Sequence, residues 1–132
     1  MSHKSILVEI AIGELVDKIT ILEIKTQRIS NPEQNKNARI ELDLLTSVRD
    51  QKIPLSSELD RLTDELRQVN ETLWEIEDAI RDCERRQDFD PQFIKLARSV
   101  YRHNDHRARL KRQINEETGS KIVEEKHYAE YE

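Results

Sequence analysis

The sequence has few of the residues that form turns and pleated sheets. Its 132 residues include two glycines, three prolines and 5% aromatic residues. Proteins built from strands and tight turns need glycine, proline and aromatic residues more often than this. Charged residues make up 37% of the chain and hydrophobic residues 36%, a balance that is typical of helical bundles with solvated outer faces. We therefore predict an all-α fold.

Cysteine and long apolar runs are also scarce. Cys83 is the single cysteine, so the chain cannot form an internal disulfide. No apolar run approaches the length that crosses a bilayer, and the N-terminus lacks the basic start, apolar run and cleavage site of a secretory signal. The sequence therefore predicts a cytoplasmic protein without membrane contact. Its length predicts one domain, residues 1–132.

Positive charge is concentrated in one segment. The net charge of −5 argues against a dedicated nucleic-acid binder. Residues 91–113, however, contain seven positively charged residues and only one negatively charged residue. This basic segment either pairs with the acidic stretch at residues 71–90 or faces an anionic partner.

Prolines and glycines divide the chain into segments. Alternating apolar residues at 6–12 predict a short extended arm that ends at Gly13. Helices are expected at about 14–29, from 32 or 35 to 50, from 56 or 57 to 87, and at 91–118, with Asp90 as an N-cap and Gly119 as a C-cap. We expect the tail, residues 120–132, to dock on the bundle.

The third expected helix carries the clearest pattern, because its apolar residues alternate at spacings of four and three. They are Leu55, Leu59, Leu62, Leu66, Val69, Leu73, Ile76, Ile80 and Cys83. Such a heptad seam must be buried against other helices of the chain or against a second copy. We predict an antiparallel bundle of about four helices with a long coiled-coil-type third helix. A homodimer through helix packing is the alternative use of the seam.

One face of the fourth expected helix changes from apolar to polar. At about 100° per residue, an inward sector contains Phe93, Val100, Asn104, Arg107, Lys111 and Asn115. Buried amides and cations are costly unless they have partners. The partners of this stripe are a carboxylate of this chain, a partner chain or a bound anion.

Other helices offer residues that could complete a site. Glu23 lies in the apolar sector of the first helix, and we predict that it pairs with Lys111 or Arg107. This pair either fixes the helix register or forms part of a pocket. Trp74 is either a core residue or a pocket wall. The candidate ligand-binding residues are Glu23, Trp74, Arg81, Arg98, Tyr101, Asn104, Arg107, Lys111 and Asn115.

Established catalytic motifs are missing from the sequence. No phosphate loop, dinucleotide fingerprint or nucleophile elbow occurs. His103 and His106 have a spacing seen in helical metal sites, but no HExxH or paired Glu-x-x-His motif supports them. We therefore predict no metal and no cofactor. Glu14 and Asp17 match half of the acidic signature of all-α nucleotide pyrophosphohydrolases.

Four sequence blocks resemble a known family. The blocks are GELVDKITILEIK from Gly13, LWEIEDAIR from Leu73, FIKLARSVYRHNDHRA from Phe93 and GSKIVEEKHY from Gly119. Together they resemble a family of short, uncharacterised bacterial and phage-encoded helical proteins, a domain of unknown function. The resemblance covers nearly the whole chain and is weakest at residues 31–57. It implies a helical fold and assigns no activity.

Three functions agree with these patterns. The first is a small binding or interaction module, whose polar, cationic site between helices holds an anionic small molecule or a partner protein. The second is a small all-α enzyme of chorismate-mutase-like or nucleotide-pyrophosphohydrolase-like type, in which placed charges stabilise a transition state. The third is a purely structural dimerisation module in which the polar stripe sets the register.

Overall fold

The computed structural model describes residues 3–132, so residues 1 and 2 of the expected domain lie outside the described part. Four helices follow one another along the chain: α1 (Ile12–Arg28), α2 (Pro32–Lys52), α3 (Ser57–Arg86) and α4 (Pro91–Thr118). Residues 3–132 contain no strand. The all-α bundle predicted from composition and periodicity is confirmed.

Local capping chemistry explains where the helices begin and end. Asn31 and Ser56 precede α2 and α3, and their side-chain oxygens accept hydrogen bonds from backbone N–H groups of the first turn. Asp90 does the same for α4, which starts with proline. Gly119 ends α4 at φ 68°, and Gln87 ends α3 at φ 53°, both left-handed conformations that terminate helices.

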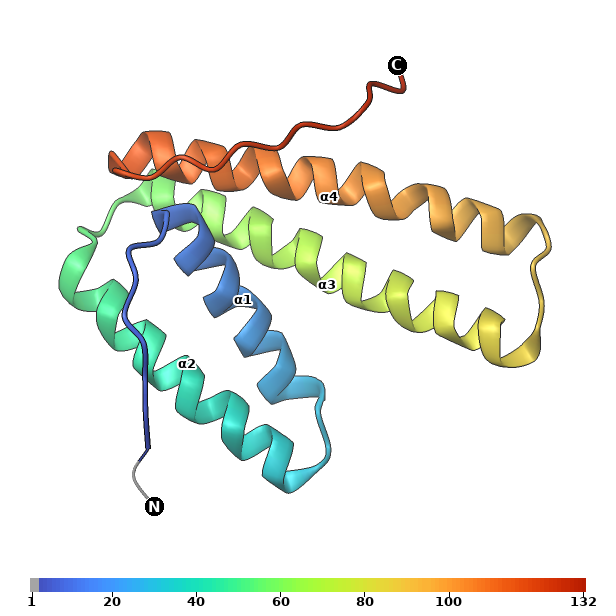
Figure 1. Cartoon of the computed structure of the whole chain (residues 1–132), viewed down its shortest axis with the longest axis horizontal. Helices are drawn as coiled ribbons and strands as arrows, with labels where there is room; N and C mark the ends of the chain where they lie inside the picture. The colour runs from blue at the N-terminus through green and yellow to red at the C-terminus, as the bar shows by residue number, and fades with distance from the viewer. Residues whose placement is uncertain (1–2) are drawn as a thin grey trace.

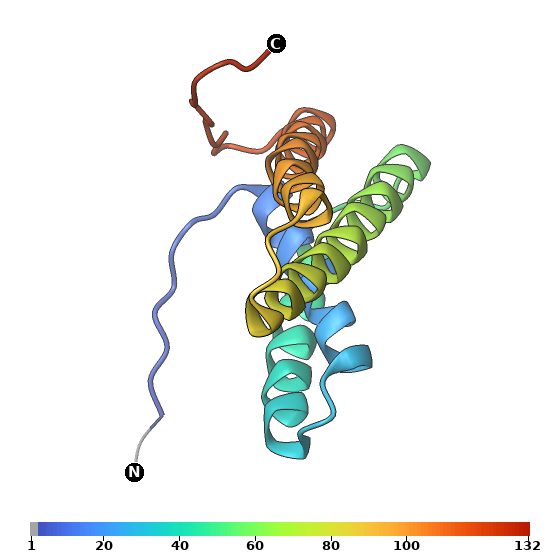
Figure 2. The same cartoon turned by 90° about the vertical axis from the view of Figure 1, so that its right-hand side faces the viewer.

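The helices form two hairpins, α1 with α2 and α3 with α4 (Figure 1). Helix α1 packs on α3 and α4 as well as on α2, whereas α2 approaches only α1 among the described helices. Seen from the side, the α1–α2 hairpin extends away from the α3–α4 hairpin (Figure 2). Helix α1 therefore joins the two hairpins, and the outer half of the α3–α4 hairpin is only two helices thick.

The heptad seam of α3 supplies the centre of the core. Buried seam residues pack with Leu15, Val16 and Ile19 of α1 and with Leu110 and Ile114 of α4. The seam is thus covered within the chain and is not a free surface for a second copy. A homodimer through helix packing stays a prediction.

One residue of the expected seam was misassigned. Leu55 lies before the first turn of α3, and its side chain is 89% exposed. The four-and-three spacing extends to Leu55 in the sequence, but the chain becomes helical only at Ser57. Spacing alone therefore placed the start of the buried seam too early.

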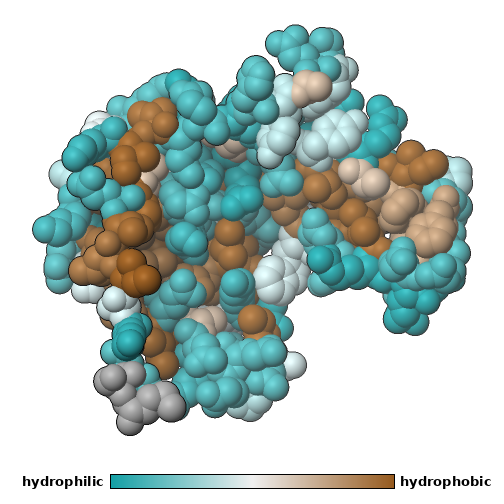
Figure 3. Space-filling model, viewed as in Figure 1, coloured by the Kyte–Doolittle hydropathy of each residue, from teal (hydrophilic) through white to brown (hydrophobic). Residues whose placement is uncertain are grey.

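The two ends of the chain are extended. The arm before α1 exposes Ile6 and Leu7 at 89% and 94%, and the C-terminal tail runs back along α4 (Figure 1). Hydrophobic atoms also reach the surface of the α3–α4 hairpin (Figure 3), where Phe89 and Phe93 meet edge to face at its outer end. Between residues 3 and 132, no helix is both long and apolar enough to cross a membrane.

Candidate functional site

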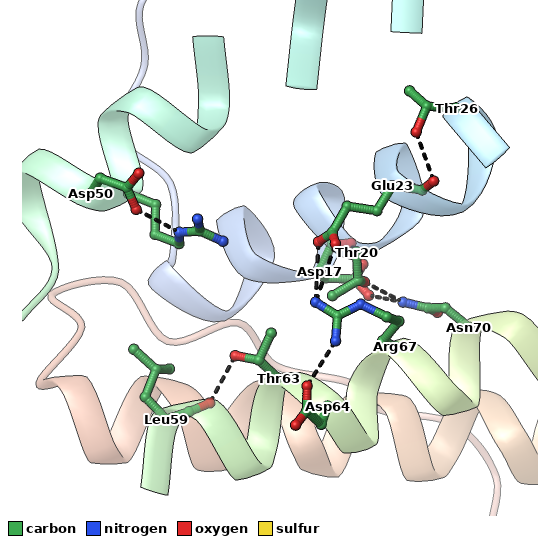
Figure 4. A network of polar contacts seen from close by, with 11 residues as sticks. Asp17, Thr20, Glu23, Thr26, Asp50, Leu59, Thr63, Asp64, Arg67 and Asn70 are labelled. Atoms are coloured by element: carbon green, nitrogen blue, oxygen red, sulfur yellow. Dashed lines mark hydrogen bonds and ion pairs between the residues drawn. The ribbon is translucent and has the colours of Figure 1, made fainter. Parts of the chain in front are cut away.

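A buried carboxylate lies where α1, α3 and α4 meet. Asp17 is completely buried and accepts hydrogen bonds from Arg107 Nε to its Oδ1 at 3.0 Å and from Arg107 Nη2 to its Oδ2. Asn70 of α3 donates from Nδ2 to Asp17 Oδ1 and to Thr20 Oγ1, at 2.9 Å each, and Figure 4 shows this contact. These contacts satisfy the buried carboxylate of Asp17, as a buried charge requires.

Two more contacts continue the line from Asp17 toward the start of α1. Lys111 Nζ lies 2.6 Å from Glu14 Oε2. One turn further along α4, the buried Asn115 accepts a hydrogen bond from the backbone N–H of Gly13 at 2.7 Å. We call the pairs Asp17–Arg107, Glu14–Lys111 and Gly13–Asn115 the α1–α4 ladder. On α4 the members lie four residues apart, which is the spacing of one helix face, and on α1 they lie at positions 13, 14 and 17 near the start of the helix.

Gly13 allows the two helices to come this close. A Cβ atom at position 13 would lie 2.3 Å from the backbone oxygen of Lys111 and 3.0 Å from Asn115 Oδ1. Backbone atoms cannot move aside as a flexible side chain can. Glycine at this position is therefore a packing requirement of the α1–α4 contact.

The α1–α4 ladder shows which groups pair with the polar side chains along α4. Arg107, Lys111 and Asn115 are satisfied by Asp17, Glu14 and the Gly13 backbone, all on α1 of the same chain. Asn104 is half-buried one turn before Arg107. Of the expected inward residues, only Asn115 is fully buried, and Leu110 and Ile114 fill the core instead.

The predicted partner of Glu23 was wrong. Glu23 pairs with Arg67 of α3 at 3.2 Å, and Arg67 also contacts Asp64 at 2.8 Å (Figure 4). Burial lowers the pKa of Arg67, but the hydrogen bonds and charges of Glu23 and Asp64 together outweigh it and leave this pKa raised. The helical wheel gave the face of Glu23 correctly, but it does not say which helix lies opposite that face.

A groove of about 1090 Å³ runs along α4 beside the ladder. Its floor and one wall belong to α4, and the other wall is the C-terminal tail. Five of the residues proposed from the sequence line it: Tyr101, Asn104, Arg107, Lys111 and Asn115. Arg107 and Lys111 thus contact α1 through their ion pairs and also line the groove. We call this feature the α4–tail groove.

The remaining candidates lie elsewhere. Glu23 faces Arg67, and Arg81 is exposed on α3, where it pairs with Glu77. Trp74 is half-buried on α3 and Arg98 is exposed on α4. None of these four lines the α4–tail groove among residues 3–132.

The two walls of the groove carry opposite charge. On α4, four positive side chains stand beside one negative side chain: Arg107, Arg109, Lys111 and Arg112 with Asp105. On the tail, four negative side chains stand beside one positive side chain: Glu124, Glu125, Glu130 and Glu132 with Lys126. The groove as a whole is therefore electrically balanced, and its cationic character belongs to α4 alone.

A polar contact at Asp105 holds the tail to α4. Lys126 Nζ lies 2.8 Å from Asp105 Oδ1, and the Tyr131 hydroxyl donates to Asp105 Oδ2 at 2.6 Å. The hydrogen bond from Lys126, followed by that from Tyr131, lowers the pKa of Asp105. The same contact raises the pKa of Tyr131. The Tyr131 ring also meets Tyr101 edge to face at 4.8 Å.

Asp17, Asn70, Arg67 and the tail were not among the sequence-based candidates. Asp17 and Glu14 were noted only as half of a pyrophosphohydrolase signature, whereas here both face cations of α4. Residues 3–132 contain no group of three or more His, Cys, Asp or Glu side chains placed to hold a metal ion. The sequence shows acidic residues at the start of α1 and basic residues on one face of α4, but it does not show that these two helices lie side by side.

Four helices with a polar groove along the last helix define a small all-α protein. The chain belongs to DUF6165, a family of unknown function whose model matches residues 6–131. No curated protein matches the chain, and no solved structure matches it. Family membership therefore agrees with the helical fold and leaves the function to be argued from the α4–tail groove.

Proposed function

We propose that this protein is a small helical binding module, and that its ligand is anionic and occupies the α4–tail groove. The observation that carries the proposal is the row of cations that α4 turns toward a groove of about 1090 Å³. A volume of this size is at the upper end of ligand sites. The opposite wall is an exposed segment of chain, so the groove can open without disturbing the core.

Arg107 is the anchor of the proposed site. Its Nε and Nη2 atoms are held by the buried Asp17 carboxylate, which fixes the plane of the guanidinium group. The hydrogen bond to Asp17 raises the pKa of Arg107, so the group stays charged. Within residues 3–132 its Nη1 atom makes no hydrogen bond, which leaves a placed donor for an anion.

Arg109 and Arg112 supply positive charge that the carboxylates of the α1–α4 ladder do not neutralise. This charge attracts an anion. Asp17 and Glu14 offset the charges of Arg107 and Lys111. Arg109 is exposed, and Arg112 pairs with two exposed carboxylates, Glu116 at 3.6 Å and Glu125 at 3.2 Å. Exposed pairs of this kind exchange readily with another anion, because each contributes little.

Calorimetric titration with inorganic triphosphate at low salt tests the proposal. We expect saturable binding to the wild-type chain that weakens steeply as salt is added. The double variant Arg109→Gln and Arg112→Gln should bind at least ten-fold more weakly. The matched control is Arg81→Gln with Arg85→Gln, which removes two exposed arginines of α3 outside the groove.

Two results would contradict the proposal. One is a lack of saturable binding of triphosphate to the wild-type chain together with a lack of binding of an acidic peptide to a chain whose own tail is weakened. The other is an equal loss of affinity in the groove variant and in the α3 control, because that would show attraction by overall charge alone.

The remaining biological assignments are proposals from the sequence. A cytoplasmic location stays a prediction from the sequence. The resemblance of the four sequence blocks supports a bacterial or phage origin. Neither assignment affects the binding experiment.

A further inference from the structure

The C-terminal tail lies along α4 and forms one wall of the α4–tail groove, as a bound extended peptide would. Its three outermost pairs with α4 are Glu124 with Lys111 at 3.5 Å, Glu125 with Arg112 at 3.2 Å and Glu132 with Arg102 at 3.5 Å. The tail runs antiparallel to α4 (Figure 1). Acidic side chains near both ends of the segment thus meet cations that lie far apart on the helix.

The tail is held by side chains on the surface and not by the core. Every residue from 123 to 132 is exposed, and the buried residues of the described chain lie between Ala11 and Asn115. The apolar docking expected for the tail is limited, since Tyr128 is 76% exposed. Ion pairs between exposed side chains are individually weak. The tail can therefore leave α4 while the bundle stays folded.

The spread of the cations favours an extended ligand. From Arg102 to Arg112 the helix rises by about 15 Å at 1.5 Å per residue. A single small anion can bridge only part of this distance. An extended chain of ten residues reaches about 30 Å, which is more than enough to place a carboxylate at each end.

Tyr131 adds recognition beyond charge. Its ring packs edge to face on Tyr101, its hydroxyl donates to Asp105, and Arg102 lies over the ring at 5.2 Å from the centroid. Aromatic and cation–π contacts favour one side chain over another in a way that bare charge does not. The same pocket would accept a tyrosine from another polypeptide.

We infer that the natural ligand of the α4–tail groove is an acidic, tyrosine-containing extended segment of a partner protein. The chain's own residues 123–132 are the intramolecular competitor for it. This inference rests on the function proposed above and names the chemical class of its ligand. Because the tail is tethered, its effective concentration at the groove is high. A partner segment must therefore bind more tightly than the free tail sequence, or bind when the tail is weakened.

Fluorescence anisotropy of a labelled peptide with the sequence of residues 121–132 tests the inference. It is titrated with the full-length wild-type chain and with the full-length variant Glu124→Gln, Glu125→Gln and Glu132→Gln, whose own tail is weakened. We expect the weakened-tail variant to bind the peptide at least ten-fold more tightly than wild type. A peptide with the same three substitutions should bind at least ten-fold more weakly than the parent peptide.

Charge reversal on α4 supplies the control. Arg102→Glu with Arg112→Glu, placed in the weakened-tail chain, should abolish peptide binding, whereas Arg81→Glu with Arg85→Glu on α3 should leave it unchanged. Both pairs of arginines are exposed, so neither change disturbs the core. Peptide binding of equal strength in the wild-type and weakened-tail chains would overturn the inference, because the tail would then not compete.

Inorganic triphosphate, titrated into the same chains, separates this inference from the proposed function. Saturable triphosphate binding without peptide binding would leave the anion site standing and overturn the inference of a peptide ligand. Failure of both probes would overturn both. Peptide binding that the weakened tail strengthens, with or without triphosphate binding, supports both.

Discussion

The carboxylate of Asp17 is fully enclosed by protein, yet it carries the charge that orients Arg107. Three donor atoms reach it, two from Arg107 and one from Asn70. A buried charge is tolerated only with such partners, and removing one partner leaves the other unpaired. Stability and the geometry of the proposed site therefore depend on the same residue.

Replacing Asp17 with Asn should lower the free energy of unfolding by about 3 kcal/mol. The amide keeps the size of the side chain but removes the charge that neutralises Arg107. Urea unfolding measures the change. Glu23→Gln is the matched control, because its pair with Arg67 is half-exposed, and it should cost less than about 1 kcal/mol. Similar losses in the two variants would show that the Asp17 pair is not buried in solution.

Gly13→Ala tests the close approach of α1 and α4. Helix propensity alone predicts that alanine stabilises α1 by about 1 kcal/mol. The new Cβ, however, would lie 2.3 Å from the Lys111 backbone oxygen, so the helices must separate. We expect a net loss of about 2 kcal/mol, measured as a lower urea midpoint. A more stable Gly13→Ala protein would rule out the packing described for the ladder.

The residues of the site were only partly predictable from the sequence. The wheel for the fourth helix identified Arg107, Lys111 and Asn115 as one face, which the ladder confirms. It did not identify Asp17 as a partner, and it paired Glu23 wrongly. Side-chain spacing defines a face within one helix, whereas the choice of partner depends on how two helices cross.

At the scale of elements, the regular spacing of apolar residues in α3 stabilises the fold only where those residues are buried. Leu66 of its seam is completely buried, whereas Leu55 is 89% exposed. Leu66→Ala should therefore reduce the free energy of unfolding by about 3 kcal/mol through lost burial and a new cavity. Leu55→Ala should change it by less than about 0.5 kcal/mol. Urea unfolding of the two variants checks this, and equal losses would place Leu55 in the seam after all.

Helix boundaries followed from local chemistry and were largely predictable. Asp90 before Pro91 and Gly119 after Thr118 define α4 as expected. The position of α2 was not predictable, because its side chains show little segregation of apolar from polar residues and only Ala38 is buried. The role of the tail as one wall of a groove was also missed, since its contacts with α4 are made by charged side chains that ordinarily indicate a solvated segment.

Tail docking should leave a signature in the ionisation of tyrosine. The hydrogen bond to Asp105 raises the pKa of Tyr131 above its ordinary value of 10.0. A raised pKa means that this contact is fully present below pH 10.0 and is lost as pH rises through the higher, docked value. Subtracting the absorbance titration of Tyr131→Phe from that of wild type isolates this residue.

We expect the isolated transition to lie above pH 10.0 and to return toward it in Asp105→Asn. A midpoint that Asp105→Asn leaves unchanged would show that the tail is free of α4. Acid should also release the tail, because Asp105 has a lowered pKa. The contribution of Asp105 to tail docking is fully present above pH 3.8, the ordinary pKa of this carboxyl group. It is lost as pH falls through the lower pKa that Asp105 has in the docked state.

At the scale of the whole molecule, helix α2 is held less firmly than the other three helices. Helix α1 has eight buried residues and contacts all three other helices. Helix α2 contacts only α1 among the helices of residues 3–132. Regions with few buried contacts open at lower free energy than the rest of a protein. The α4–tail groove is lined by α4 and the tail, and its Arg107 is held by Asp17 of α1, so opening of α2 leaves the groove intact.

Hydrogen exchange should therefore show α2 opening before the rest of the bundle. We expect the slowest amides in α1 around Ile19 and in α3 around Leu66, both completely or almost completely buried, and faster exchange throughout α2. Ala38→Gly should weaken α2 by about 1 kcal/mol, which speeds its exchange about five-fold and leaves α3 and α4 unchanged. If α2 and α1 instead exchange at one rate in both proteins, the α1–α2 hairpin opens as one unit, which would contradict the separate opening of α2.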